Sequence, residues 1–330
     1  MLRDDILSLL RSRPDAYLSG EAMSHSLGVS RAAVWKAVEA LRRDGYQIDS
    51  VSNRGYRLVS APDRLRAGEL SGPLEGRLIG RELVCLDTVD STNTEVKRRA
   101  AEGAPEGLAV LAGEQTMGRG RRGNSFQSLD GKGLYLSVLL RPQVSLKLLS
   151  ELTAWTAVAV CRGIQACCGA SPAIKWTNDL LLGGKKLCGI LTELEFEAES
   201  AAPVRVVVGI GVNVSQTTAD FGPELSQIAT SLAQELGRPV RRADLAGSIL
   251  AALDDMYAAF PGGKAEYWAE YRARCATLGR DVNLVGPAGV RPAFARDIDQ
   301  DFALVVDYPD GATGVVTAGE VSVRGLMGYV

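Results

Sequence analysis

Apolar residues in the first sixty positions recur at helical spacing and then alternate as they do in a hairpin. Helical patterns are predicted at 2–10, 19–27 and 31–45, and an apolar–polar alternation follows at 46–60 around an Asn-Arg-Gly turn. Three helices and a hairpin in this order predict a winged helix-turn-helix, with the helix-turn-helix itself at about Gly20 to Glu39.

The third of these helices is amphipathic. Its apolar residues fall on one face, while the opposite face and the tip of the hairpin carry basic side chains. Such a helix suits the DNA major groove, and a basic hairpin reaches phosphates or the minor groove. The residues predicted to contact DNA are Ser30, Arg31, Ala32, Trp35, Lys36, Arg54 and Arg57. The alternative is a small packing domain that uses the same helices for protein contacts. Trp35 stands where a polar residue is more usual for base reading, so the helix indicates no operator sequence.

Strand and helix patterns are mixed in the long middle part of the chain. Residues 61–76 are polar and rich in proline and glycine, which predicts a linker. Strands are predicted at 81–89, 107–115, 133–142, 173–176, 186–198 and 204–214, and helices at 92–101, 146–168, 244–260 and 264–277. Strands outnumber the helices between them and many connect by hairpins, which favours an α+β fold with a mixed sheet.

Short strands with Gly, Pro and Asp turns follow from Leu278, and they predict a small β-barrel. Three domains are therefore expected, at 1–62, 63–277 and 278–330.

Composition narrows the chemistry. The chain has 330 residues, of which 46% are apolar and 23% charged, and a net charge of −2, so any nucleic-acid binding must come from a local patch. Six scattered cysteines without a C-x-x-C pair favour buried thiols in a reducing cytosol over disulfides or a zinc site. The chain has neither a run of about 18 apolar residues nor a signal-peptide pattern, so a cytoplasmic protein without membrane contact is expected. The single histidine, His25, argues against histidine-based catalysis.

The loop GEQTMGRGRRGNSF at 113–126 combines four glycines with three arginines. It matches neither a P-loop nor a Rossmann turn, because it lacks the G-K-[ST] ending and no helix is predicted directly after it. Glycine allows a ligand to approach the backbone closely, and arginine can donate two parallel hydrogen bonds to a phosphate or carboxylate. These features predict an anion-binding loop, and the alternative is a solvated surface loop.

Six motifs occur in order along the chain: DSTNTE (90–95), GEQTMGRGRRG (113–123), KWTNDL (175–180), GKKLCGILTE (184–193), GIGVNV (209–214) and AGEVSVRG (318–325). Together they closely resemble the bacterial biotin protein ligases, over essentially the whole chain. The N-terminal winged helix resembles that of the bifunctional class, which also represses the biotin biosynthesis operon.

The resemblance implies a class II synthetase-like ligase domain, a C-terminal SH3-like β-barrel and a reaction in two steps. Biotin and ATP with Mg²⁺ give biotinyl-adenylate, and the biotinyl group then passes to a lysine of the biotin carboxyl carrier protein of acetyl-CoA carboxylase. It also implies that the glycine–arginine loop is disordered when empty and closes over the anions. The adenylate-bound form is implied to be a homodimer that binds biotin operator DNA.

The resemblance also implies the roles of site residues, position by position. Biotin binding is implied for Ser91, Thr92, Asn93, Gln115, Gly118, Arg119, Gly120, Arg121, Lys186 and Gly189. ATP binding is implied for Arg121, Arg122, Phe126, Asn178, Lys186, Asn213 and Arg324. Catalytic roles are implied for Lys186, Arg119, Arg121 and Asp179, with Asp179 also a candidate for contact with Mg²⁺ held by the ATP phosphates.

Several readings stay open at this point. The resemblance alone selects Lys186 over its neighbour Lys185, and Phe126 and Thr177 stand where many relatives have Trp and Pro. A thiol nucleophile at Cys188 is set aside in favour of packing, since the family forms an acyl-phosphate. The rival functions are a transcription factor that only senses biotin, a lipoate ligase, and a ligase whose N-terminal DNA-binding domain is vestigial.

Overall fold

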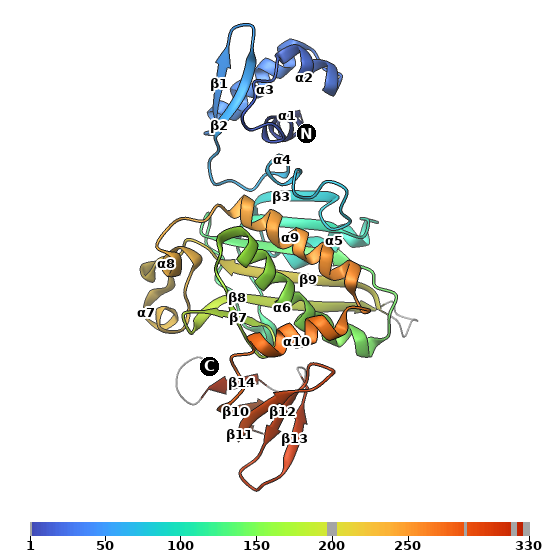
Figure 1. Ribbon diagram of the computed structural model, residues 1–330, viewed down its shortest axis with the longest axis vertical. Coiled ribbons are helices and arrows are strands. Elements are labelled where there is room, and N and C mark those ends of the chain that lie inside the picture. Colours follow the sequence, from blue (N-terminus) through green and yellow to red (C-terminus); the bar gives the residue numbers. More distant parts are fainter. Residues whose placement is uncertain (1, 197–202, 287–288, 318–321, 326–330) are drawn as a thin grey trace.

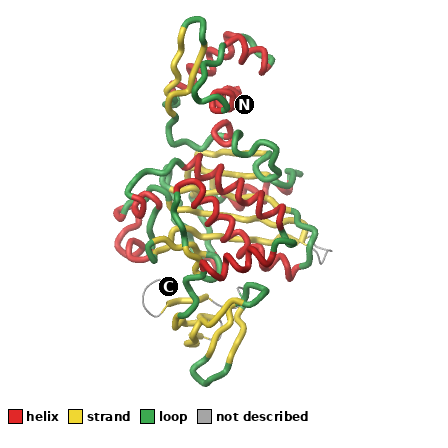
Figure 2. Tube along the Cα trace, viewed as in Figure 1, coloured by secondary structure: helices red, strands yellow, loops and turns green. Residues whose placement is uncertain are grey.

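The fold is described from a computed structural model, which covers residues 2–196, 203–286, 289–317 and 322–325. Figure 1 shows a small N-terminal head, a broad central sheet covered by long helices, and a C-terminal β-sheet at the opposite end from the head. Figure 2 shows helices and strands interleaved through the central part, as an α+β fold requires.

The head has the winged helix-turn-helix order that the sequence predicts. Its elements are α1 (Leu2–Arg11), α2 (Gly20–Leu27), α3 (Arg31–Arg43), β1 (Gln47–Val51) and β2 (Gly55–Ser60). The hydroxyl of Ser30 accepts a hydrogen bond from the Ala33 backbone N–H at 3.1 Å, and Gly28 ends α2 in the left-handed conformation. The buried face of α3 is the predicted one: Val34, Ala37, Val38 and Leu41.

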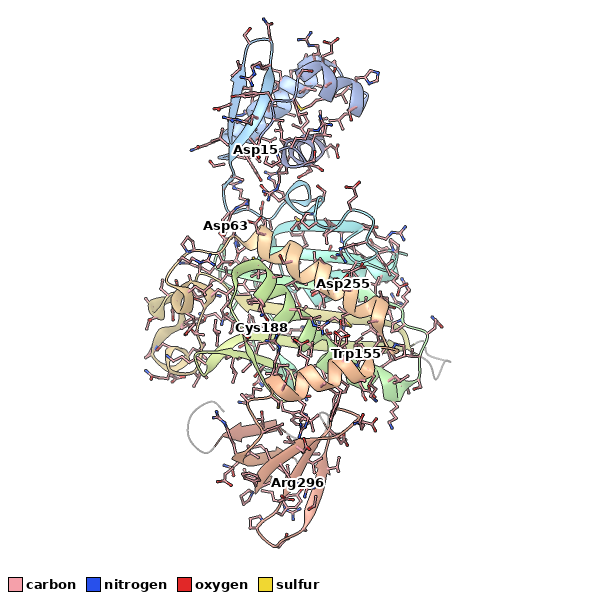
Figure 3. All side chains as sticks on the ribbon, in the orientation of Figure 1. Asp15, Asp63, Trp155, Cys188, Asp255 and Arg296 are labelled. Carbon is pink, nitrogen blue, oxygen red and sulfur yellow. The ribbon has the colours of Figure 1, made fainter. Side chains whose placement is uncertain are left out.

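The segment predicted to be a polar linker contains a short helix, so that prediction was wrong in part. Helix α4 (Ala67–Leu70) buries Glu69 and Leu70 between the head and the central body. Four residues are too few to show helical periodicity, and their burial depends on packing against distant parts of the chain. Figure 3 labels Asp63 in the segment between the head and the central body.

The central sheet has seven strands in the order β3-β4-β5-β9-β8-β7-β6. Strands β3 and β4 are parallel and the other neighbours are antiparallel, which confirms the predicted mixed sheet. The strands are β3 (Glu82–Val89), β4 (Leu108–Gln115), β5 (Gly133–Leu140), β6 (Ala173–Lys175), β7 (Asp179–Leu182), β8 (Lys185–Phe196) and β9 (Pro203–Asn213).

Helices cover both faces of this sheet. Alternate residues of β4 belong to different cores: Ala109 and Leu111 pack in the large core with α6, whereas Leu108 and Val110 pack with α5. The helices are α5 (Thr92–Ala101), α6 (Leu146–Cys168), α7 (Thr218–Ile228), α8 (Leu232–Leu236), α9 (Arg242–Ala259) and α10 (Lys264–Arg274). In Figure 1, α6, α9 and α10 lie across one face.

Helices α7 and α8 were missed from the sequence. Helix α7 is interrupted at Gly222, which has a φ of 72°, and by Pro223, so its apolar residues do not keep one helical period. Helix α8 has five residues.

The C-terminal part is a five-stranded antiparallel sheet in the order β13-β12-β11-β10-β14. Its strands are β10 (Arg280–Gly286), β11 (Gly289–Ile298), β12 (Leu304–Asp307), β13 (Thr313–Val316) and β14 (Ser322–Gly325). Its buried face joins the large core: Tyr271 of α10 meets Phe302 edge to face at 5.4 Å. Within the described residues, no helix is both long and apolar enough to cross a membrane.

Candidate active site

A cleft of about 510 Å³, open to solvent, lies where the glycine–arginine loop meets strands β7, β8 and β9. It gathers residues from five of the six motifs, each represented in part. The lining consists of Ser91, Thr92, Asn93, Gln115, Arg119, Gly120, Arg121, Phe126, Asn178, Asp179, Lys186, Gly189, Ile190, Leu191, Gly209, Ile210 and Gly211. The last five residues of this lining were not named from the sequence: Ile190 and Leu191 lie on β8, and Gly209, Ile210 and Gly211 lie on β9.

One end of the cleft is formed by the start of α5. The carbonyl oxygen of the Gln115 side chain accepts hydrogen bonds from the Thr92 N–H at 2.8 Å and from its hydroxyl at 3.1 Å. Gln115 therefore caps α5 from outside the helix. Ser91 occupies the N-cap position, and among the described residues its side chain makes no capping hydrogen bond. Its hydroxyl therefore lies on the cleft wall without a capping role.

Asn93 lies deeper at the same end and is 4% exposed. Its Nδ2 atom donates to the Glu193 carboxylate at 2.7 Å, and its Oδ1 atom accepts from the Ser137 hydroxyl at 2.6 Å. A side chain on Gly209 would collide with Asn93, so the strand can pass behind this amide only because residue 209 is glycine. Glu193 and Ser137 were not predicted, since their roles depend on strands that meet only in the folded sheet.

The opposite end of the cleft carries the charged groups. Nζ of Lys186 lies 2.7 Å from Oδ1 of Asp179. Arg121 donates through Nη1 to the Asn178 side-chain oxygen at 2.9 Å, and Nδ2 of Asn178 donates to the Ile190 carbonyl at 2.9 Å. The Thr-Asn-Asp turn is therefore tied both to the loop and to β8.

The geometry separates the two neighbouring lysines. Lys185 donates through Nζ to the Ser226 carbonyl at 2.9 Å and lies away from the described lining of the cleft. A register shift between Leu180 and Leu181, where β7 pairs with β8, accompanies this arrangement. Lys186 is thus the lysine that the fold directs into the cleft.

The glycine–arginine loop has a defined conformation. A β-bridge joins Arg119 to Ser125, and residues Arg121–Gly123 form a 3-10 turn. The Phe126 N–H donates to the Gly118 carbonyl at 3.0 Å, and a Cβ at Gly118 would lie 2.6 Å from the Ser128 hydroxyl. Gly118 thus shapes the loop and, within the described lining, does not itself face the cleft.

Phe126 forms one wall of the cleft. Its ring packs over Gly211, where a Cβ would lie 2.7 Å from a ring carbon, and it meets Tyr135 edge to face at 6.4 Å. The glycines of β9 therefore leave the space that this aromatic wall occupies.

Asn213, for which ATP binding is implied by the resemblance, is absent from the described lining of the cleft. Its Nδ2 atom donates to the Thr230 carbonyl at 3.0 Å and more weakly to the Lys186 carbonyl at 3.4 Å, while its oxygen accepts from Gln216 at 3.2 Å. These contacts hold the segment before α8 against the strand that carries Lys186. Arg122 and Arg324 lie in a described turn and strand, but their side chains fall outside the described part of the molecule.

Cys188 is fully buried in the central sheet, where Figure 3 labels it. Burial raises the pKa of its thiol well above the ordinary value, so the protonated form dominates at neutral pH. The packing role expected for Cys188 fits this environment.

The head carries a second candidate surface. Trp35 is 55% exposed, and Arg31, Ala32, Lys36 and Arg54 are also exposed. Arg54 and Arg57 both lie over the ring of Tyr17, at 4.6 and 4.9 Å from its centre, so this tyrosine holds the two wing arginines together. Tyr17 lies outside the helical and strand patterns, and for that reason it was missed.

Comparison with known proteins agrees with this geometry. Residues 85–213 match the model of the Biotin/lipoate A/B protein ligase family, and residues 3–57 match a helix-turn-helix domain model. The chain is 40% identical over 256 residues to the bifunctional ligase/repressor BirA of Bacillus subtilis, covering 78% of each chain. It is 31% identical over 309 residues to BirA of Escherichia coli, covering 93% of this chain and 92% of the relative.

A solved structure, the biotin protein ligase from Aquifex aeolicus in complex with biotin and ATP, superposes with a TM-score of 0.65 at 28% identity. It covers 74% of this chain and 99% of the Aquifex chain. The fold and the cleft thus define a ligase with a helix-turn-helix head. The chain belongs to the biotin protein ligase family, and its head assigns it to the bifunctional ligase/repressor class.

Proposed function

We propose that the chain joins biotin to AMP, transfers the biotinyl group to a carrier-protein lysine, and represses transcription according to biotin supply. The distribution of polarity along one cleft carries the proposal. Arg121 and Lys186 bring positive charge to one end beside Asp179, whereas the other end has neutral hydroxyl and amide groups. A ligand with a neutral polar ring system, a carboxylate and an adjoining phosphate fits this gradient, and biotin with ATP has these parts.

The fused rings of biotin would bind at the start of α5. Its ureido group both donates and accepts hydrogen bonds, which suits Ser91, Thr92, Asn93 and Gln115. Gly189 lines the same cleft from β8 and leaves room for the ligand close to the strand.

In the first step, a carboxylate oxygen of biotin attacks the α-phosphorus of ATP. A bond forms between this oxygen and phosphorus, and the bond from phosphorus to the pyrophosphate oxygen breaks. Lys186, Arg119 and Arg121 would stabilise the negative charge that grows on the phosphoryl oxygens, a contribution that is usually large in a water-poor site. Gly118 and Gly120 would let the loop close over the anions.

The nucleotide would lie beyond Lys186. Phe126 would stack against its base, and Asn178 would orient it from the turn that Arg121 also holds. Arg122 and Arg324 are proposed to face the phosphates or ribose as the family resemblance implies. Asn213 is proposed to act indirectly, through its contacts behind Lys186.

Magnesium is proposed to arrive with ATP. Mg²⁺ is usually held by one or two carboxylates and by substrate phosphates, and Asp179 is the single acidic residue of the described cleft lining. Within the described residues, no three acidic, cysteine or histidine side chains gather as an all-protein metal cage. Asp179 therefore fits as the protein ligand, and bound magnesium would offset part of the phosphate charge.

In the second step, the amine of a carrier lysine attacks the carbonyl carbon of the adenylate. An amide bond forms, the bond from that carbon to the phosphate oxygen breaks, and AMP leaves while the nitrogen loses a proton. Asp179 would orient the incoming amine. We propose the biotin carboxyl carrier protein of acetyl-CoA carboxylase as the acceptor.

The head would bind biotin operator DNA through α3 and the Arg54–Arg57 wing. A two-fold homodimer of the adenylate-bound form would present two heads to paired half-sites. We further propose domain limits of 1–62, 63–277 and 278–330, closure of the C-terminal sheet into an SH3-like barrel, and a cytosolic location without membrane contact.

The test is biotin-dependent exchange of labelled pyrophosphate into ATP, with Lys186→Ala beside Lys185→Ala as a matched control. We expect exchange that requires biotin and Mg²⁺, that collapses in Lys186→Ala, and that persists in Lys185→Ala. Absence of exchange by folded wild-type protein would leave the biotin-sensing transcription factor as the better reading, to be tested by biotin-dependent operator binding. If the wild-type protein shows biotin-dependent pyrophosphate exchange but does not bind operator DNA, the alternative of a ligase with a vestigial DNA-binding domain is supported.

A further inference from the structure

A chain of polar contacts runs beneath the ring-binding end of the cleft. Lys97 of α5 lies 2.8 Å from Oε1 of Glu193, and the other carboxylate oxygen accepts from Asn93 Nδ2 at 2.7 Å. On the far side of the same amide, Ser137 of β5 donates to Asn93 Oδ1 at 2.6 Å. Glu193 is absent from the described lining of the cleft, so it acts through Asn93 and not on a ligand directly.

An ionised carboxylate can accept hydrogen bonds but cannot donate them. Glu193 therefore fixes which end of the Asn93 amide is the NH₂ group, because only that end can donate to it. The Nδ2 atom is turned toward Glu193, with a longer contact of 3.5 Å to the Leu191 carbonyl. The Oδ1 atom has two lone pairs. One accepts the hydrogen bond from Ser137, and the second can accept another hydrogen bond.

The surroundings keep Glu193 ionised. Burial alone would raise the pKa of its carboxyl group, but the hydrogen bonds from Lys97 and Asn93 and the charges of Lys97 and Arg119 outweigh burial and lower the pKa. The carboxylate is therefore present at neutral pH, and Asn93 keeps one orientation.

We propose that Glu193, held by Lys97, is a positioning residue that sets the Asn93 amide as an acceptor for a ring N–H of the ligand. This inference rests on the proposed function, in which the ligand is the ureido ring of biotin. A matched acceptor strengthens binding of the ring and leaves the reaction at the distant carboxylate unchanged.

The test is Glu193→Gln, which keeps the shape of the side chain but can present either an acceptor or a donor to Asn93. We expect KM for biotin in pyrophosphate exchange to rise about tenfold, with kcat and KM for ATP within about twofold of wild type. The matched control is Glu195→Gln, on the same strand, where Glu195 pairs with Arg205 at 3.2 Å. Its biotin KM should stay at the wild-type value.

A double-mutant cycle separates positioning from a general structural role. In an Asn93→Ala background, Glu193→Gln should cause no further rise in biotin KM, because Glu193 acts through that amide. Equal rises in both backgrounds, an unchanged KM in the single variant, or a fall in kcat matching a loss of thermal stability would overturn the inference. Wild-type protein without biotin-dependent exchange would instead contradict the proposed function itself.

Discussion

The ammonium of Lys186 lies 2.7 Å from the carboxylate of Asp179, across the turn that joins β7 to β8. This pair brings the cation of one motif to the acid of another at the charged end of the cleft. Lys185, one residue away, faces the other side of the strand and contacts Ser226. Alternation along the strand thus decides which lysine meets the substrate.

Asp179→Asn should slow adenylation while leaving the fold intact. The amide keeps the size of the side chain but removes the charge that pairs with Lys186 and would meet magnesium. We expect the pyrophosphate-exchange rate to fall about a hundredfold, in the range found when one preorganised polar group is lost. Asp255→Asn, which alters an exposed ion pair with Arg77, is the control. If Asp179→Asn exchanges pyrophosphate at the wild-type rate, Asp179 has no catalytic role.

Gly211→Ala should displace the aromatic wall. The new Cβ would lie 2.7 Å from a ring carbon of Phe126, so the ring must shift. We expect Kd for ATP to rise about tenfold and stability to fall by about 1–3 kcal/mol, as in overpacked sites. Gly72→Ala is the control, since in the described structure its Cβ would meet nothing within 4 Å. Isothermal titration with ATP and thermal unfolding measure both effects, and unchanged ATP affinity would count against a nucleotide site at Phe126.

Cys188→Ala should retain transfer activity. Burial raises the pKa of Cys188 well above that of a free thiol, so its reactive thiolate is scarce at neutral pH. Raising the pH from 7 to 9 should barely accelerate iodoacetamide labelling of Cys188 in the folded protein. In urea the labelling rate should climb, because an exposed thiol titrates near 8.5. Peptide mass spectrometry gives both rates, and loss of biotin transfer in a stable Cys188→Ala protein would revive a thioester route.

Glu69→Ala should loosen the head from the central body. Its buried carboxylate forms ion pairs with Arg11 of α1 and with Arg241, which precedes α9. Helix α1, helix α4 and the start of α9 therefore meet at Glu69. The side chains of Arg11 and Arg241 are 28% and 32% exposed, so the loss of stability should be smaller than the roughly 3–5 kcal/mol typical of a fully buried ion pair. We expect faster tryptic cleavage within 61–66 and an earlier transition in urea. Asp255→Ala, with a side chain 66% exposed, should change stability by less than about 1 kcal/mol.

Arg54→Ala should weaken DNA binding without affecting ligation. Losing one phosphate contact reduces the magnitude of the slope of the log binding constant against log salt concentration by about 1. The reduction should be similar for operator DNA and for unrelated DNA. Arg291→Ala is a matched control, because Arg291 also stacks on a tyrosine, Tyr308, but lies on the C-terminal sheet. Equal salt slopes for wild type and Arg54→Ala in fluorescence anisotropy would exclude a phosphate contact by Arg54.

Helices and strands were predicted correctly where their limits depend on residues close together in the sequence. The helix 146–168 was predicted at its observed limits because no proline interrupts its largely apolar sequence before Gly169, which ends it in the left-handed conformation. Helix α7 was not, because Gly222 and Pro223 break its period. The contact of Asn213 with Thr230 was not predicted, because Thr230 lies on a segment that no local pattern links to Asn213.

The sequence by itself determined the order of elements, the winged head, the glycine–arginine loop and the motifs that mark a biotin ligase. These follow from periodicity, caps and turn residues, which act over a few positions. Only the tertiary structure decided that Lys186 and not Lys185 enters the cleft, that Gln115 caps α5, and that Glu193 lies behind Asn93. Such contacts join strands and helices far apart in sequence, and they exist only after burial of the sheet's two faces brings those elements together.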